Sequence, residues 1–538
     1  MSTGSTGRER VIALALTGLV ALSVLFAGAR AAVGSWVPHT DNAYFTVRSL
    51  DVATRYHPLL GAWSSGTADV AVDVNNLGPL QLYLLAPFTK IAPMGGTAIG
   101  VVAVHVLAIL TIAWLVHRIG GWRSVIPAMT AVALLTWVMG SEMLITPQQH
   151  QYLMLPYLCV LVSAWAAAAG DRWALVPFVV AGTLVCQTHL SYPILVAGVG
   201  LPAVVGQVLA ARRTGGIGPF RRPWTIAAVT GLILWSPAVI DQFFGWGNVT
   251  NVLRSPGETS APGWGTAVRI VSAVLADPRG YFRPGFRDYG PLATLAGNPS
   301  VVLFVLMWAA LAVGAAATFR RHRRTATAGF VVAFLAVTAG VVDAAQLPPI
   351  RFGLAAANYR WLWPTATFLV IGALIAVERA TRRYNRSIGP IGFAAAAVVL
   401  LALNVPTSQQ MPQSDEYVEG ERATSEMVRQ LASAELEMFD GPVVIDQSRM
   451  GFGHPFAYVI AAVLLDHGVD FRLDGDRQAR RFGEGRVSDG TEHDRLLLVR
   501  GDEAEAVRGD DAVLAFVDGP DPVALVLVDN ASSPDPSD

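Results

Sequence analysis

Long apolar runs dominate the first 404 residues and restrict what this chain can fold into. Segments 301–319 and 391–404 contain no charged side chain. Several runs approach or exceed the ~20 residues that a helix needs to cross a hydrocarbon core of about 30 Å. Over the whole chain, 53% of the residues are hydrophobic and 15% are charged, whereas soluble domains have roughly 45–50% and about 25%. The sequence therefore predicts a polytopic α-helical membrane protein.

About eleven segments are predicted to span the membrane. The first follows Arg8 and Arg10, and it is longer than the ~7–15-residue apolar core of a signal peptide, which favours a retained helix. The predicted spans are 11–33, 97–117, 124–140, 150–169, 173–188, 193–211, 224–243, 300–319, 326–345, 359–377 and 388–404. The apolar segment 77–93 is short and contains three prolines, so we expect it to lie in the membrane interface.

Arginines alternate between the connecting loops. They gather in every second loop, at 118–123, 172, 212–222, 320–324 and 379–386, whereas the short turns 141–149 and 189–192 contain none. Because positive loops stay on the cytoplasmic side, this alternation predicts a cytoplasmic N-terminus. An odd number of spans then puts everything after residue 404 outside, which we interpret as the outer face of a bacterial cytoplasmic membrane.

The composition changes after residue 404. Residues 405–538 contain 27 acidic side chains and eleven arginines, although the formal net charge of the whole chain is only −1. Helical patterns at 415–438 and 455–466 alternate with β-like runs at 442–446, 469–473, 495–500 and 523–528, and residues 531–538 are expected to be disordered. We predict a membrane part, 1–404, and a small extracytoplasmic α/β domain with a partly parallel sheet, 405–538.

The outer loop 34–96 is the candidate site of chemistry. Asp41 falls where the chain leaves the membrane after the first span. A carboxylate there can act as a general base that takes a proton from an acceptor hydroxyl. The alternative is that Asp41 caps a helix that starts at Ala43, because Asp is a common N-cap residue.

The same loop carries two segments that resemble a known superfamily. They are DVATRYHPLLGAWSS, starting at residue 51, and NNLGPLQLYLLAPF, starting at residue 75, and both follow the acidic Asp41. This order resembles the GT-C superfamily of lipid-linked-sugar glycosyltransferases, and in particular a group of high-GC bacterial membrane proteins. The chain differs from many relatives in having Asp41-Asn42 instead of two adjacent acids, and Asn75-Asn76-Leu77-Gly78-Pro79 instead of a His-Pro-Gly-Pro turn.

The resemblance implies an inverting glycosyltransferase with a polyprenyl-phosphate-sugar donor and a glycan or glycolipid acceptor in the cell envelope. Arg48 and Arg55 are seven residues apart, so one helix would place them on a single face near His57, where they would meet the donor phosphate. Asn76 is a further candidate contact. Alternatively, the arginines pair with membrane lipid headgroups or with Asp51.

A second set of candidate substrate-binding residues lies at the outer ends of later spans. The set comprises His150, His189, Tyr192, Arg351, Tyr359 and Arg360. Polar groups at membrane depth are costly and are commonly functional. The alternatives are solvated histidines at helix ends and aromatic side chains that mark the membrane interface.

The sequence indicates no cofactor, no structural metal and no nucleic-acid partner. The histidines do not follow a ligand spacing such as His-Glu-x-x-His, and no glycine-rich phosphate loop is present. Under the resemblance a divalent metal is possible, but a single acid at Asp41 weakens the case for it. Two other classes remain: a transporter or flippase of a lipid-linked or small solute, and a scaffold that binds cell-wall partners through its outer domain.

Overall fold

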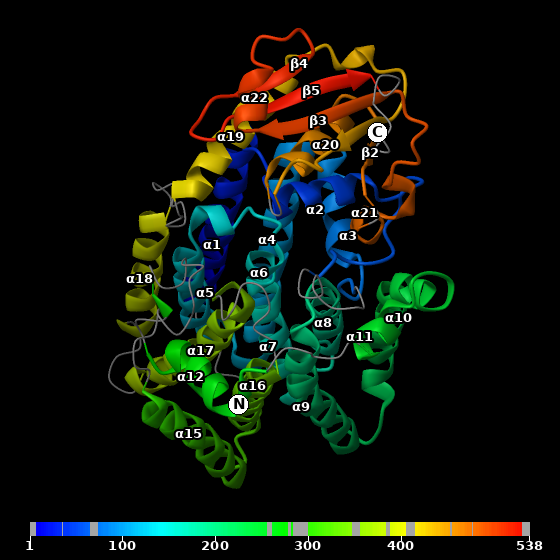
Figure 1. Cartoon of the computed structure of the whole chain (residues 1–538). Coiled ribbons are helices and arrows are strands. Elements are labelled where there is room, and N and C mark those ends of the chain that lie inside the picture. Colours follow the sequence, from blue (N-terminus) through cyan, green and yellow to red (C-terminus); the bar gives the residue numbers. More distant parts are fainter. Residues whose placement is uncertain are drawn as a thin grey trace.

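We describe the fold from a computed structural model of the chain. The described residues are 7–34, 36–64, 74–254, 261–277, 281–282, 300–346, 356–382, 388–404, 415–451, 454–475 and 477–529. A helical bundle lies on one side and a small sheet on the other (Figure 1). The predicted disordered tail 531–538 lies outside the described residues.

The helices of the bundle follow the apolar runs, because a backbone in a bilayer has to satisfy its hydrogen bonds internally. The long ones are α1 (Gly7–Val33), α4 (Pro93–Gly120), α5 (Trp122–Met143), α7 (Met154–Ala168), α8 (Leu175–Thr188), α9 (Tyr192–Arg213), α10 (Gly218–Phe244), α12 (Gly263–Leu275), α15 (Val301–Arg320), α16 (Arg324–Gln346), α17 (Leu362–Thr381) and α18 (Ile388–Asn404). Short elements are α2 (Asp41–Leu50), α3 (Leu80–Thr89), α6 (Gln149–Tyr152), α11 (Asn248–Arg254) and the 3-10 turn η2 (Ala356–Tyr359).

Each of the eleven predicted spans coincides with a helical segment. Within the described residues, nine helical segments are long and apolar enough to cross a membrane. The other two, α8 and α18, have 14 and 17 residues. Apolar side chains such as Leu232 and Ile233 of α10 are 74% and 64% exposed, as expected of a surface that faces lipid. The protein is a multi-pass membrane protein.

Ion pairs join loops that the arginine pattern assigns to the same side. Arg118, in the last turn of α4, pairs with Asp171, just after α7, at 2.6 Å. Arg123 at the start of α5 pairs with Glu9 at the start of α1 and with Glu378 near the end of α17. These contacts agree with the predicted alternation of helix directions in the membrane.

The C-terminal part is a five-stranded sheet with flanking helices. The strands are β1 (Val443–Asp446), β2 (Phe471–Leu473), β3 (Asp494–Arg500), β4 (Val513–Val517) and β5 (Val523–Asp529), in the order β2-β1-β3-β5-β4. Strand β1 is parallel to β2 and β3, and β5 is antiparallel to β3 and β4, so the predicted partly parallel sheet is confirmed. The accompanying helical elements are α19 (Asp415–Leu431), η3 (Leu436–Met438), α20 (Phe456–Asp466), α21 (Arg477–Phe482), η4 (Glu484–Arg486) and α22 (Asp502–Ala506); β4, α21 and α22 had not been predicted.

Helix α2 connects the two parts of the molecule. It packs against α3 and α4 of the bundle and against α20 beside the sheet, and Figure 1 shows α2 and α3 between the sheet and the long helices. Eight of its ten residues are buried, from Asn42 to Ser49. The outer loop and the C-terminal part therefore lie on the same side of the membrane.

Candidate functional site

Asp41 opens helix α2 where the loop, the bundle and the C-terminal part meet. The helix begins at Asp41 and its N-cap is Thr40, whose φ is 50° and whose side chain makes no capping hydrogen bond. The alternative in which Asp41 caps a helix starting at Ala43 is therefore wrong. Its carboxylate instead stands in the first turn, where the helix dipole favours negative charge.

Three side chains from distant parts of the chain surround the Asp41 carboxylate. Gln148 Nε2 lies 3.4 Å from Asp41 Oδ2, a long contact, and Arg481 and Tyr458 interact with Asp41 electrostatically. The side chain keeps solvent exposure although protein surrounds it closely. This desolvation raises the pKa of the Asp41 carboxyl above its ordinary value, and Gln148 and Arg481 partly offset the increase.

The segment 148–151 links Asp41 to the histidines. The Gln148 backbone N–H donates to Asn42 Oδ1 at 3.2 Å, and Gln151 Nε2 donates to Gln148 Oε1 at 2.7 Å. Gln149 Nε2 donates to the carbonyl of Thr188 at 2.7 Å. One short segment thereby fixes the start of α2 against the end of α8.

His150 belongs to this segment, and its ring lies against that of His189. Their ring centroids are 4.8 Å apart, and His189 lies 6.1 Å from Tyr192. Burial lowers the pKa of His189 to about 4, so its ring is neutral at pH 7. Arg360 and Asn358 interact with His150, and Arg360 also interacts with Tyr192. The structure thus brings together four of the predicted residues.

Below this group lies a set of buried polar atoms without a hydrogen bond among the described residues. Thr188 Oγ1 and Ser191 Oγ belong to it. Buried polar atoms in proteins are almost always hydrogen-bonded. Each of these two hydroxyls can therefore form a further hydrogen bond. Tyr359 is 1% exposed at the adjoining turn η2, and Arg351 lies outside the described residues.

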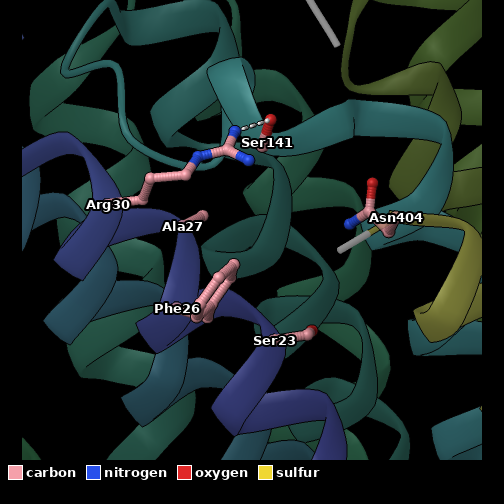
Figure 2. Close-up of a pocket in the computed structure, with 6 residues that line it drawn as sticks. All are labelled: Ser23, Phe26, Ala27, Arg30, Ser141 and Asn404. Atoms are coloured by element: carbon pink, nitrogen blue, oxygen red, sulfur yellow. Dashed lines mark hydrogen bonds between the residues drawn. The ribbon is translucent and has the colours of Figure 1, made fainter. Parts of the chain in front are cut away.

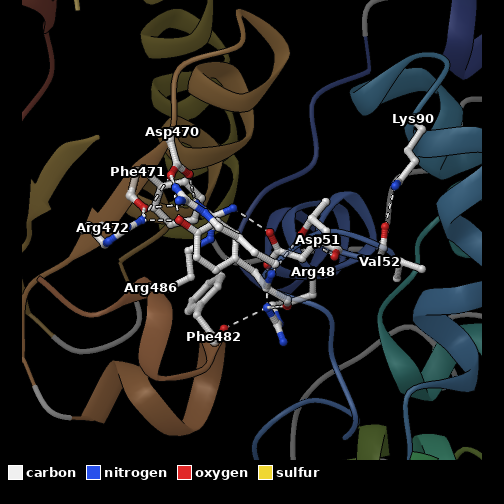
Figure 3. A network of polar contacts seen from close by, with 12 residues as sticks. Arg48, Asp51, Val52, Lys90, Asp470, Phe471, Arg472, Phe482 and Arg486 are labelled. Atoms are coloured by element: carbon white, nitrogen blue, oxygen red, sulfur yellow. Dashed lines mark hydrogen bonds and ion pairs between the residues drawn. The ribbon is translucent and has the colours of Figure 1, made fainter. Parts of the chain in front are cut away.

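Arg48 and Arg55 do not share a helix face, contrary to the prediction. Helix α2 ends at Leu50 and the chain turns at Ala53, whose φ is 60°. Arg48 is buried, and its Nη1 donates to Asp51 Oδ2 at 2.5 Å and to the carbonyl of Phe482 at 2.8 Å; Figure 3 shows these contacts. Arg55 pairs with Asp470 in the C-terminal part. The alternative in which Arg48 pairs with Asp51 describes this geometry.

His57 and Asn76 hold the outer loop in shape. His57 Nδ1 accepts the Ala53 N–H at 2.9 Å, and His57 Nε2 lies 2.8 Å from the Tyr83 hydroxyl, so the neutral ring with its proton on Nε2 fits both contacts. Asn76 Nδ2 donates to the carbonyl of Ala62 at 2.9 Å. No contact brings either side chain to Asp41, and their predicted substrate-binding role stays a prediction.

Arg481 and Tyr458 are the site residues that the sequence did not indicate. Arg481 Nη1 donates to the Tyr458 hydroxyl at 2.6 Å, and its guanidinium lies 4.5 Å from the centroid of the Trp63 ring. Both residues belong to the C-terminal part, more than 400 positions from Asp41 along the chain. No local motif marks them, because only the folded chain brings them to the outer loop.

Two cavities in the described part of the chain lie away from Asp41. The one in Figure 2 lies between α1, α5 and the end of α18, and it has a volume of about 10 Å³, room for about one water molecule. It is lined by Ser23, Phe26, Ala27, Arg30, Ser141 and Asn404. A second, of about 200 Å³, lies where α7, α9, α10 and α16 meet. Within the described part of the chain, no group of three or more His, Cys, Asp or Glu is arranged to hold a metal ion.

Comparisons with known proteins find solved structures with a similar overall arrangement. No family model and no curated protein matches the sequence. ArnT from Cupriavidus metallidurans in the apo state has 14% identity and a TM-score of 0.46, with 97% of this chain and 99% of that chain covered. Its structure bound to undecaprenyl phosphate has 12% identity and a TM-score of 0.44, with 98% and 99% covered.

An archaeal enzyme is also similar. The oligosaccharyltransferase of Archaeoglobus fulgidus, tethered to an acceptor peptide that contains the NVT sequon, has 14% identity and a TM-score of 0.40. The similarity covers 83% of this chain and 63% of that chain. At these identities and TM-scores the similarity to ArnT and to this oligosaccharyltransferase is one of overall arrangement.

Proposed function

We propose that this protein is a GT-C-type glycosyltransferase that moves a sugar from a polyprenyl-phosphate donor to a cell-envelope glycan or glycolipid at the outer face of the cytoplasmic membrane. The observation that carries the proposal is the position of Asp41. It is a solvent-reachable carboxylate at the start of α2, in contact with Gln148 of the bundle and near Arg481 of the C-terminal part. The likeness to ArnT, one structure of which holds undecaprenyl phosphate, is compatible with it.

The proposed reaction is a single displacement with inversion at the anomeric carbon. Asp41 takes the proton of an acceptor hydroxyl, and the hydroxyl oxygen forms a bond to the anomeric carbon. The bond between that carbon and the phosphate oxygen breaks, and polyprenyl phosphate leaves with the electron pair. A phosphate monoester is a good leaving group, so the chain has to supply a base and positive charge but no general acid.

The polar group around His150 supports the placement of the sugar. His150, His189 and Tyr192 lie beside the segment that contacts Asp41. The unpaired hydroxyls of Thr188 and Ser191 lie in the same region. A sugar ring presents several hydroxyls, each of which can donate and accept a hydrogen bond. The two histidines, Tyr192 and the Thr188 and Ser191 hydroxyls offer donors and acceptors for these hydroxyls, beside the charged Arg360.

The test is transfer of a radiolabelled sugar from polyprenyl-phosphate donors by purified full-length protein. Asp41→Asn should lower kcat by about 100-fold or more, because a positioned general base contributes about 10²–10⁴-fold. Asp440→Asn is the matched control, since Asp440 is exposed in the C-terminal part. Unchanged turnover in Asp41→Asn would show that Asp41 is not the general base. Counterflow of donor in proteoliposomes without a covalent product would favour a transporter instead of a transferase.

A further inference from the structure

The end of helix α21 is held by the outer loop at three consecutive backbone carbonyls. Asn75 Nδ2 donates to the carbonyl of Arg480 at 3.0 Å, and the Tyr44 hydroxyl donates to the carbonyl of Arg481 at 2.9 Å. Arg48 Nη1 donates to the carbonyl of Phe482 at 2.8 Å. The last carbonyls of a helix have no partner within it. Here three side chains from separate points of the outer loop, those of Asn75, Tyr44 and Arg48, supply the partners. We call this arrangement the clamp on α21.

This arrangement fixes the position of one side chain, that of Arg481. Its backbone carbonyl is bound by Tyr44, which lies one turn after Asp41 on the same helix. Its guanidinium is set between the Tyr458 hydroxyl, at 2.6 Å, and the Trp63 ring, at 4.5 Å. The residue is partly exposed and interacts electrostatically with Asp41. A cation from the C-terminal part is thereby held beside the proposed base.

Two neighbouring arginines, Arg48 and Arg486, are committed to buried ion pairs within the fold. Arg486 is 2% exposed, and its Nη2 lies 2.6 Å from Asp51 Oδ1, as Figure 3 shows. Arg48 is 6% exposed and pairs with the same carboxylate. Breaking such buried pairs leaves an uncompensated charge. Neither side chain is therefore suited to exchanging its partner for a substrate.

We propose that Arg481 is the residue that binds the phosphate of the lipid-linked donor, so that the C-terminal part completes the active site. The proposal rests on the proposed function for the reaction, but it concerns the binding of a phosphate monoester or diester as such. As the bond from the anomeric carbon to oxygen breaks, the phosphate changes from one negative charge toward two. A fixed guanidinium stabilises that developing charge and presents planar donors that match phosphate oxygens.

The same guanidinium reduces the repulsion between an ionised Asp41 and the donor phosphate. Both anions have to occupy one site for an acceptor hydroxyl to be activated. In a region of low effective dielectric, two negative charges at short distance oppose each other strongly. A cation between Tyr458 and Trp63 lies within electrostatic reach of Asp41. It therefore stabilises the charge on the base as well as that on the donor.

Binding of undecaprenyl phosphate to the purified full-length protein in nanodiscs tests the proposal. Arg481→Gln should weaken the affinity by about tenfold or more, since hydrogen bonds to charged groups contribute about 1.5–3 kcal/mol, and Arg481→Lys should retain part of it. The matched control is Arg480→Gln, because the Arg480 guanidinium lies over Trp246 at 4.2 Å and its carbonyl is bound by Asn75. Polyprenol, which lacks the phosphate, should bind equally to wild type and Arg481→Gln.

Two outcomes would overturn the proposal: wild-type affinity for undecaprenyl phosphate in Arg481→Gln, or an equal loss in Arg480→Gln. The apparent Tm of each variant identifies misfolding, and Arg481→Lys provides a second measurement if the glutamine variant is unstable. Turnover of Asp41→Asn is measured in parallel. If Asp41→Asn is inactive but Arg481→Gln binds the phosphate normally, only the role of Arg481 is wrong. If Asp41→Asn is active but Arg481→Gln binds the phosphate weakly, only the role of Asp41 as the base is wrong.

Discussion

Asp41 is exposed like an ordinary surface aspartate, but protein groups surround its carboxylate more closely. The protein around it raises the pKa of the carboxyl, and Gln148 and Arg481 act in the opposite direction. A base with a raised pKa holds a proton more strongly, which helps it to take one from a hydroxyl. It also has to be ionised before each turnover. These two requirements give the reaction a defined dependence on pH.

We expect the acid limb of the pH profile of kcat/KM to report the ionisation of Asp41. Because the pKa of Asp41 is raised, activity should fall as the pH drops through a value above the ordinary aspartate value of 3.8. Arg481 lowers that pKa, so Arg481→Gln should shift the limb to still higher pH. The measurement is kcat/KM of the free enzyme against pH for both proteins. A limb at or below 3.8, or a shift toward lower pH in the variant, would contradict the assignment.

Arg486 and Asp51 join elements that lie far apart in the chain. Asp51, directly after α2, accepts from Arg48 at 2.5 Å and from Arg486 at 2.6 Å, and Arg486 also pairs with Asp470 just before β2. Asp51 is 1% exposed. Asp470 also pairs with Arg55 and Arg472, so the network continues from the buried Asp51 into the C-terminal part. It ties the turn after α2 to the edge of the sheet.

Removing the central carboxylate should loosen this connection. Asp51→Asn leaves two arginines buried without their shared partner, which costs about 3–5 kcal/mol in comparable buried pairs. The control is Asp521→Asn, since Asp521 pairs with Arg500 at a site where its side chain is 53% exposed, and exposed pairs contribute about 0–1 kcal/mol. Denaturant unfolding in detergent measures the difference. Similar losses in both variants would show that the network does not stabilise the junction.

The elements divide into those that local sequence predicts and those that it does not. The spans follow from hydropathy, because a bilayer selects apolar segments of a fixed length. The turn after α2 does not, since it contains a positive φ at Ala53, a conformation that alanine rarely adopts. Arg48 and Arg55 were therefore placed on one helix. Asp41 was identified from its position after the first span, whereas Arg481 was missed because it reaches the site only through the clamp on α21.

At the scale of the whole molecule, opposite charges lie on opposite sides of the predicted topology. The C-terminal part is strongly acidic, and the arginine-rich loops all fall at the other ends of the helices. The contacts between α2 and α20 put the outer loop on the side of the C-terminal part. The arginine pattern predicts that this side is the outside of the membrane.

Thiol labelling in intact cells tests this orientation. Asp440→Cys and Thr214→Cys place single exposed cysteines in the C-terminal part and in an arginine-rich loop, and the native Cys159 and Cys186 are buried. A membrane-impermeant maleimide should label position 440 in intact cells and position 214 only after permeabilisation. The reverse pattern would invert the topology and move the proposed reaction to the cytoplasm.

The clamp on α21 also determines when during synthesis the protein becomes active. Tyr44 and its partner Arg481 are 437 residues apart, and at about 5–20 residues per second roughly 20–90 s of translation separate their synthesis. During that interval the first helices already occupy the membrane with Asp41 in place, while the cation and the carbonyls of α21 do not yet exist. A ribosome-bound intermediate is therefore a lipid-embedded protein without a working site. Under the proposed role of Arg481 and the predicted topology, the site is complete only after the C-terminal part has been synthesised and has crossed the membrane.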